Sequence, residues 1–326
     1  MFEFSAEETQ YLQFQNLLYS GDYIEKEIIL FDGFSMANEI VEAVQIRPLE
    51  IERLANLCEK LIKIDETRYS FRKCLITIGL KKAPKLIHIL FLRGVYEMAE
   101  VVPILEGMGL FLPVCYFYEH IFDFFAFTKG FDDKSKCRKR FFDLCESEKS
   151  GLLSLLKYGC FIGTVEYCIK YDIHELFVEL SNHPQFGINT LYKWEPFEWS
   201  RKPNNMSYLS ISAWFGSIQC FRLLLIHGCQ IERATIQSAI FGGNLDILSM
   251  SINKLGTTYD CLIESSEYVR FQTFDWVFEQ FPKYNEKMLL HQSIKIIRDS
   301  LKNGISINQN IGVFIYFLVI QPSFII

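Results

Sequence analysis

Two glycine residues in matching sequence contexts constrain this chain more than any other feature of its sequence. Gly216 and Gly243 each stand between two apolar stretches with helical periodicity, and the same interval leads on to Arg270. A short helix, a glycine turn and a second short helix form a hairpin that cannot bury its apolar face alone. The repeated pattern therefore predicts helical hairpins that stack in series.

Residues 207–232 carry the clearest hairpin pattern, SYLSISAWFGSIQCFRLLLIHGCQIE. The small pair Ser212 and Ala213 predicts a first helix that another helix can approach closely. The second helix places Cys220, Phe221 and Leu224 at i, i+1 and i+4, on one face. Gly228 follows where a helix ends, so we expect it in the left-handed conformation.

The rest of the chain also has helical periodicity, and no Asn-Gly or Asp-Gly turn joins two alternating runs. We therefore predict an all-α fold class. The stretch 111–127 is rich in aromatic residues, but charged residues interrupt it, so it is typical of a core helix rather than a membrane span. Helices are expected at 36–46, 48–64, 85–92, 97–105, 114–127, 137–145 and 165–181.

The hairpin pattern resembles the ankyrin repeat. Residues 207–216 are similar to the TPLHLAAxxG helix, with Ser210 in place of its histidine, and residues 223–228 are similar to the LLLxxG ending. Weaker copies follow at 234–256 and 261–281, and a last ending at Gly304–Asn308. The resemblance implies an irregular ankyrin-type α-solenoid that binds proteins and performs no catalysis.

A narrower resemblance covers most of the chain. AVQIRP (43–48), TVEYCIKYD (164–172), WEPFEWSRKP (194–203) and FGSIQCFRLLL (215–225) together look like a large family of ankyrin proteins of unicellular eukaryotes. Members carry a helical N-terminal region of unknown function. The expected organisation is an N-terminal helical region (1–131), hairpins leading into the stack (132–186), a long finger loop (187–206), ankyrin-type repeats (207–310) and an apolar tail (311–326).

Composition excludes several classes of function. The 326-residue chain has a net charge of −6, so its surface as a whole does not attract nucleic acid. Its ten cysteines form no CxxC pair, and phosphate-binding and hydrolase motifs are missing, so we expect no metal, no cofactor and no enzyme activity. Reduced cysteines and an acidic start favour an intracellular protein, cytoplasmic rather than nuclear. The basic run 134–140 could be an import signal, but a solvated helix face is the preferred interpretation.

Candidate partner-binding residues lie in two places. The finger loop is far longer than the connection between the next two repeats, and Trp194, Phe197, Trp199 and Arg201 resemble interface anchors. The alternative, which we prefer, is that these aromatic residues fold back and seal the joint between the N-terminal helices and the stack. The outward part of the first helices would add Tyr208, Ser210 and Trp214. The partner would be a protein that the sequence does not identify.

The apolar tail, residues 311–326, cannot serve as the polar cap that a solenoid needs at its end. Its continuous apolar run is shorter than the roughly 20 residues of a membrane-spanning helix. We expect a lid over the last hairpin or self-association. The alternative function is membrane association through this tail.

Overall fold

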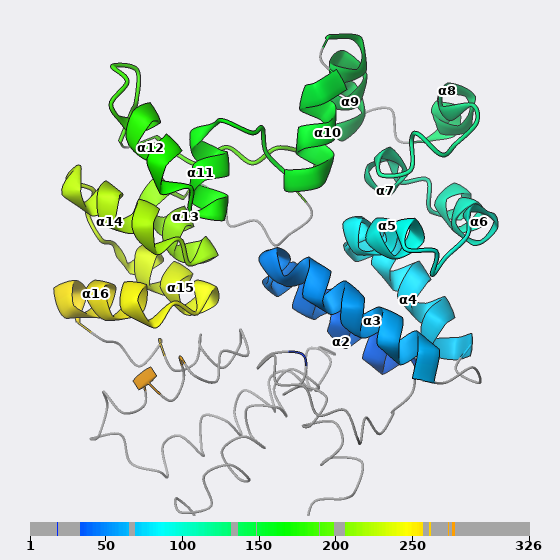
Figure 1. The fold of residues 1–326 in the computed structure, drawn as a ribbon, viewed down its shortest axis with the longest axis horizontal. Helices are drawn as coiled ribbons and strands as arrows, with labels where there is room; N and C mark the ends of the chain where they lie inside the picture. Colours follow the sequence, from blue (N-terminus) through cyan, green and yellow to red (C-terminus); the bar gives the residue numbers. More distant parts are fainter. Residues whose placement is uncertain are drawn as a thin grey trace, which may run out of the picture. The chain divides into compact units, whose positions relative to one another are not determined.

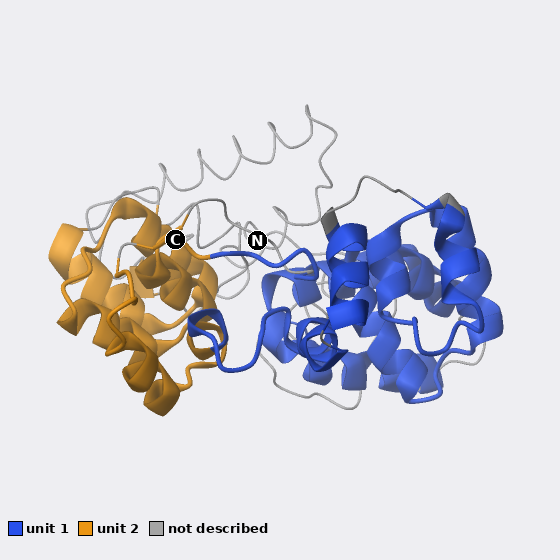
Figure 2. Cartoon of the chain, turned by 90° about the horizontal axis from the view of Figure 1, so that it is seen from above, with its two compact units in different colours: residues 1–167, 193–203 blue, residues 168–192, 204–326 orange. Residues whose placement is uncertain are grey.

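The computed structural model describes residues 18, 33–64, 69–131, 136–147, 149–188, 190–198, 206–256, 261, 273, 276 and 277. Among these residues helices dominate and no strand forms, which confirms the all-α class (Figure 1). The chain divides into two compact units. Unit 1 contains residues 1–167 and 193–203, and unit 2 contains residues 168–192 and 204–326 (Figure 2).

Helices of unit 1 bury aliphatic side chains at helical spacing. In the helix 33–46, Met36, Ile40 and Val44 fall on one buried face, and this helix packs against the segment 69–82. The elements are α2 (Gly33–Ile46), η1 (Pro48–Glu50), α3 (Ile51–Ile64), α4 (Tyr69–Lys82), α5 (Pro84–Leu92), α6 (Met98–Met108), α7 (Phe111–Cys115), α8 (Phe124–Phe127), η2 (Thr128–Gly130), α9 (Lys136–Ser147) and α10 (Lys149–Tyr158).

An aromatic cluster forms the core beneath α7, α8 and α9. The ring of Phe141 lies with its centroid 5.6 Å from that of Phe111 and 5.1 Å from that of Phe124. The continuous helix expected over 114–127 is wrong, because turns occupy the residues between α7 and α8. Asp123 then caps α8 by accepting a hydrogen bond from the backbone N–H of Ala126.

The described part of unit 2 consists of stacked helical hairpins. Its elements are α11 (Val165–Tyr171), in which the division between the units falls, α12 (His174–Ser181), α13 (Tyr208–Phe215), α14 (Ile218–Ile226), α15 (Arg233–Gly242) and α16 (Leu245–Leu255). In Figure 1 the helices α11, α13 and α15 form one row, and α12, α14 and α16 form a second row beside it. The single helix expected over 165–181 is wrong, because Asp172 breaks it into α11 and α12.

Some of the predictions lie outside the described residues. They are the repeat ending at Gly304–Asn308 and the apolar tail 311–326. The copy at 261–281 is described only at residues 261, 273, 276 and 277. The expected division at 131/132 lies inside unit 1, and the two units divide at 167/168, 192/193 and 203/204.

Candidate functional site

Three turn residues give the hairpins of unit 2 a common geometry. Asp172, Gly216 and Gly243 connect the two helices of successive hairpins and have φ values of 53°, 72° and 73°. Asp172 adopts a left-handed conformation that few residues other than glycine tolerate. The chain is longer between Asp172 and Gly216 than between Gly216 and Gly243, because only the first interval contains the finger loop.

The residues at the turns bond each hairpin to its neighbour. The carboxylate of Asp172 accepts hydrogen bonds from the backbone N–H of Gln219 (3.1 Å) and of Cys220 (2.9 Å), and so caps α14 from the preceding hairpin. The side-chain amide of Asn244 donates to the carbonyl of Gly216 at 3.1 Å, while its oxygen caps α16. These bonds fix the register of the stack at its turn end, which we call the turn ladder.

A chain of hydroxyl groups joins the starts of α13 and α15. Ser207 caps α13 through the N–H of Ser210, whose hydroxyl lies 3.0 Å from the hydroxyl of Thr235. Thr235 in turn accepts from the backbone N–H of Glu232 at 3.2 Å. Ser210 occupies the position where the resemblance expects a histidine, and Thr235 lies beside it at the start of the next hairpin. The two hydroxyls therefore supply a buried hydrogen bond between hairpins.

Helices α13 and α15 approach each other at a glycine. A Cβ atom placed on Gly242 would lie 2.1 Å from the carbonyl oxygen of Ala213 and 3.1 Å from that of Trp214. The prediction that Ala213 lies at a close helix crossing is confirmed. Gly228 has a φ of 95°, which confirms its predicted left-handed conformation.

The structure corrects the orientation expected for three candidate binding residues. Tyr208, Ser210 and Trp214 are buried, with at most 8% of each residue exposed. Trp214 stacks on Phe241 of α15, with ring centroids 3.4 Å apart, and Tyr208 lies against Phe186. These side chains hold hairpins together and do not form an outward surface.

Described residues of the finger loop likewise make contacts with other residues of the same chain. The base of the loop is closed by an antiparallel bridge between Leu191 and Ser207 and by the hydrogen bond from the N–H of Tyr192 to the carbonyl of Met206 (2.9 Å). Residues 193–203 belong to unit 1, where Phe197 is fully buried. Phe197 is therefore not an exposed anchor, and its burial agrees with the preferred alternative that this ring folds back into the protein.

Other residues of the finger loop are placed as follows. Trp194 is half-buried, whereas Trp199 and Arg201 lie outside the described residues. The hydroxyl of Tyr116 donates a hydrogen bond to the carbonyl of Phe197 at 3.1 Å. Burial, followed by the charge of Glu198, raises the pKa of Tyr116 well above its ordinary value, so this phenol remains protonated and can donate.

Two cations of the basic run 134–140 make internal contacts. Arg138 donates to the carbonyls of Thr128 (2.7 Å) and Phe131 (3.2 Å), and its guanidinium lies over the ring of Phe142. Arg140 pairs with Glu195 at 3.5 Å. Arg138 and Arg140 therefore do not form part of a freely solvated helix face, and the import signal stays a prediction.

An exposed apolar surface lies where the hairpins of unit 2 connect to one another. We call it the loop edge and define it by Phe186, Leu191, Ile226, His227 and Gln230. Leu191 is 48% exposed and Ile226 is 79% exposed. The rings of Phe186 and His227 are 6.2 Å apart, and the thiol of Cys229 lies 3.8 Å from the carbonyl of Ile188, so the two connections are neighbours. This surface was not predicted from the sequence, although Ile226 follows the buried positions of α14 at a spacing that places it on the opposite face.

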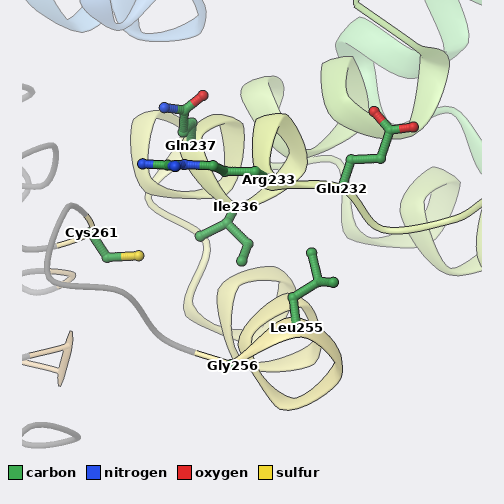
Figure 3. Close-up of a pocket in the computed structure, with 7 residues that line it drawn as sticks. All are labelled: Glu232, Arg233, Ile236, Gln237, Leu255, Gly256 and Cys261. Carbon is green, nitrogen blue, oxygen red and sulfur yellow. The ribbon is translucent and has the colours of Figure 1, made fainter.

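A cavity of about 250 Å³ lies at the far side of the last described hairpin (Figure 3). Ile236 of α15 and Leu255 of α16 form its apolar part, and Cys261 approaches from the following segment. Its other lining residues are Glu232, Arg233, Gln237 and Gly256. The apolar part of this cavity can hold apolar groups.

Burial shifts the pKa of several titratable groups in the described core in the direction that favours their neutral forms. Burial raises the pKa of the Cys58 thiol to about 12 and also raises the pKa of Cys220 and Cys229. These thiols stay protonated near neutral pH and are weak nucleophiles. Burial and the neighbouring His120 lower the pKa of His88 to about 4, so its imidazole is neutral. In the described ranges no three metal-ligating side chains gather. The helices of these same ranges all lack the length and apolar character of a bilayer span.

Comparison of the chain with protein-family models, with curated proteins and with solved structures gives no match.

Proposed function

We propose that the chain is a non-enzymatic protein-binding scaffold built on ankyrin-type hairpins. The turn ladder carries this proposal. Asp172, Gly216 and Gly243 place successive hairpins in one register, and the bonds of Asp172 and Asn244 connect each hairpin to its neighbour. Stacks of this kind present extended surfaces that bind partners without a deep pocket.

The loop edge is the part of unit 2 that best suits a partner. Leu191 and Ile226 expose apolar surface, while His227 and Gln230 provide polar groups beside it. Apolar centres with a polar margin are typical of protein interfaces. We therefore assign partner binding to the loop edge in place of Tyr208, Ser210 and Trp214.

Affinity enrichment with the full chain tests this assignment. The variant Leu191→Ser/Ile226→Ser removes the apolar part of the loop edge, and Leu92→Ser/Leu153→Ser is the matched control, because those leucines are also exposed but lie in unit 1. We expect the parent and the control to retain the same proteins, and the loop-edge variant to lose them. Equal retention by all three chains would refute the loop edge as the binding surface.

The alternative function, membrane association through residues 311–326, stays a prediction, as do the intracellular location and the absence of catalysis. Flotation of the full chain with phosphatidylcholine vesicles, compared with a chain that ends at Asn308, separates the alternative from the scaffold. Vesicle binding that depends on the tail would favour it.

A further inference from the structure

Among the described residues of unit 1, the two most exposed large apolar side chains lie together around α8. Phe122, in the turn that leads into this helix, is 108% exposed, and Phe125, three residues later, is 66% exposed. The adjacent Ala126 is exposed as well. We call Phe122, Phe125 and Ala126 the aromatic tip. Exposure of this extent means that the Phe122 ring projects from the surface and that no groove encloses it.

The residues beneath the aromatic tip hold it in place. The ring of Phe125 stacks on the ring of Phe142 in α9, with the centroids 5.3 Å apart. The hydroxyl of Thr128 donates to the carbonyl of Phe124 at 2.8 Å, and Arg138 of α9 donates to the carbonyl of Thr128 at 2.7 Å. The aromatic tip is therefore fixed in its exposed position, so binding of a partner costs little conformational entropy.

Two lysines flank the aromatic tip. Lys129 follows Phe125 by four residues in the helical run formed by α8 and η2. Lys139 precedes Phe142 by three residues on α9, so it lies on the face of α9 that carries the stacked ring. Both lysines are exposed, and neither ammonium group forms an ion pair with a described carboxylate. Their positive charges are therefore available to a negatively charged partner.

Two exposed carboxylates lie near these lysines and extend less far from the backbone. Asp123 caps α8 by accepting a hydrogen bond from the N–H of Ala126 at 3.0 Å, and Asp143 follows Phe142 on α9. Aspartate has a short side chain, whereas lysine carries its ammonium group at the end of a long flexible stem. The ammonium groups of Lys129 and Lys139 can therefore reach farther from the protein than the carboxylates.

We propose that the aromatic tip inserts into the surface of an anionic membrane, with Lys129 and Lys139 bound to lipid headgroups. A protein partner would need a pocket that matches a projecting ring, whereas the interface of a bilayer closes around a ring of any shape. Lysines beside the inserted rings add attraction to anionic lipids. The site lies in unit 1, so it goes beyond the proposed scaffold function and does not depend on the loop edge.

Co-sedimentation of the full chain with vesicles tests the site. We expect binding to vesicles of equal parts phosphatidylcholine and phosphatidylserine, and weaker binding to phosphatidylcholine alone. Phe122→Ser/Phe125→Ser should weaken binding to the anionic vesicles about 100-fold, since each ring withdrawn from lipid contributes about tenfold. Phe34→Ser/Leu92→Ser is the matched control, because these side chains of unit 1 are also exposed, by 60% and 61%. The control should bind like the parent.

Charge variants test the headgroup contact separately. Lys129→Gln/Lys139→Gln should weaken binding to the anionic vesicles about 30-fold, since each charge near such a surface changes binding about fivefold. Asp143→Asn should strengthen that binding about fivefold for the same reason. Lys81→Gln/Lys157→Gln is the control, because these two exposed lysines lie on α4 and α10. Unchanged urea midpoints would show that all of these chains keep their fold.

The proposal is overturned if the parent does not bind the anionic vesicles, or if the parent and Phe122→Ser/Phe125→Ser bind them equally. A chain that ends at Asn308 should bind like the parent. Loss of all vesicle binding in that shortened chain would assign the membrane contact to the tail and likewise overturn the role of the aromatic tip. If the parent ignores vesicles and Phe122→Ser/Phe125→Ser loses proteins in affinity enrichment, a protein occupies the aromatic tip and the proposal is wrong.

Discussion

Replacement of Gly242 by alanine tests how closely α13 and α15 approach each other. The new Cβ atom would lie 2.1 Å from the carbonyl oxygen of Ala213 and 3.2 Å from the backbone nitrogen of Gly216. The shortest favourable distance between a carbon and an oxygen atom in proteins is about 3.3 Å, so the two backbones must separate by about 1 Å. The obstacle is backbone rather than a flexible side chain, so it cannot move away by a change of rotamer.

The expected magnitude follows from two opposing effects. Overpacking of this kind lowers the free energy of unfolding by about 3 kcal/mol. Alanine gains about 1 kcal/mol over glycine inside a helix. We therefore expect a net loss of about 2 kcal/mol in unit 2, because separation of the helices also strains the Trp214–Phe241 stack and the bond between Ser210 and Thr235.

Amide hydrogen exchange of the full chain is the suitable assay, since a chain with two units need not unfold in one step. A loss of about 2 kcal/mol accelerates the exchange of the slowest amides of α13 and α15 by about 30-fold. Gly107→Ala is the control, because Gly107 lies exposed in α6 of unit 1 with no atom within 4 Å of an added Cβ, and it should leave the exchange of α13 and α15 unchanged. If Gly242→Ala exchanges like the parent, the close crossing is wrong.

Three further predictions address the cap, the buried imidazole and the tail. Asp172→Ala removes the cap of α14 and keeps a side chain in the left-handed conformation, so the free energy of unfolding should fall by about 1 to 3 kcal/mol in urea titration. Asp172→Gly should lower the free energy of unfolding by less, because it removes only the cap. His88 has a pKa of about 4 in the folded chain, below its unfolded value of about 6.5, so the unfolded chain binds the proton first. The free energy of unfolding should therefore fall as pH drops from about 6.5 to 4. His88→Gln should flatten this pH dependence in thermal melts at several pH values. A chain that ends at Asn308 should become less soluble or change its oligomeric state in sedimentation, and unchanged behaviour would argue against a lid or self-association.

The glycine turns and the close helix crossing of the stack could be predicted from the sequence. Gly216, Gly228 and Gly243 all have positive φ, and small residues mark the helix crossing at Ala213. These features are encoded by residues adjacent in the chain, because only glycine adopts the left-handed conformation without strain.

The hairpin α11–α12 could not be recognised in the same way. Its turn residue is Asp172, which takes the position of a glycine and contributes its carboxylate to the next hairpin. Nothing near Asp172 in the sequence shows that Gln219 and Cys220 will supply the donors that stabilise this conformation. The periodicity of 165–181 therefore predicted one helix where the structure has two.

The candidate site was predicted less well than the fold, because exposure depends on distant segments. The pattern of α13 identifies its apolar residues, but it does not show that Tyr208 lies against Phe186 or that Trp214 lies against Phe241. Likewise, Phe197 is buried by residues of unit 1 that lie far away in the sequence. Helical periodicity reports which faces are apolar and does not identify what covers them.

The turn ladder also determines where this chain can accept new sequence. Asp172, Asn244 and their partners fix the register at one end of every described hairpin, while the additional length of the finger loop enters at the opposite end. Length can therefore vary at that end while the stack keeps its register. The exposed turn at Gly228, where an added Cβ meets no atom within 4 Å, is the corresponding position of the next hairpin. A peptide epitope inserted there should be displayed on an intact stack, so the architecture can acquire a second finger loop without any change in its core.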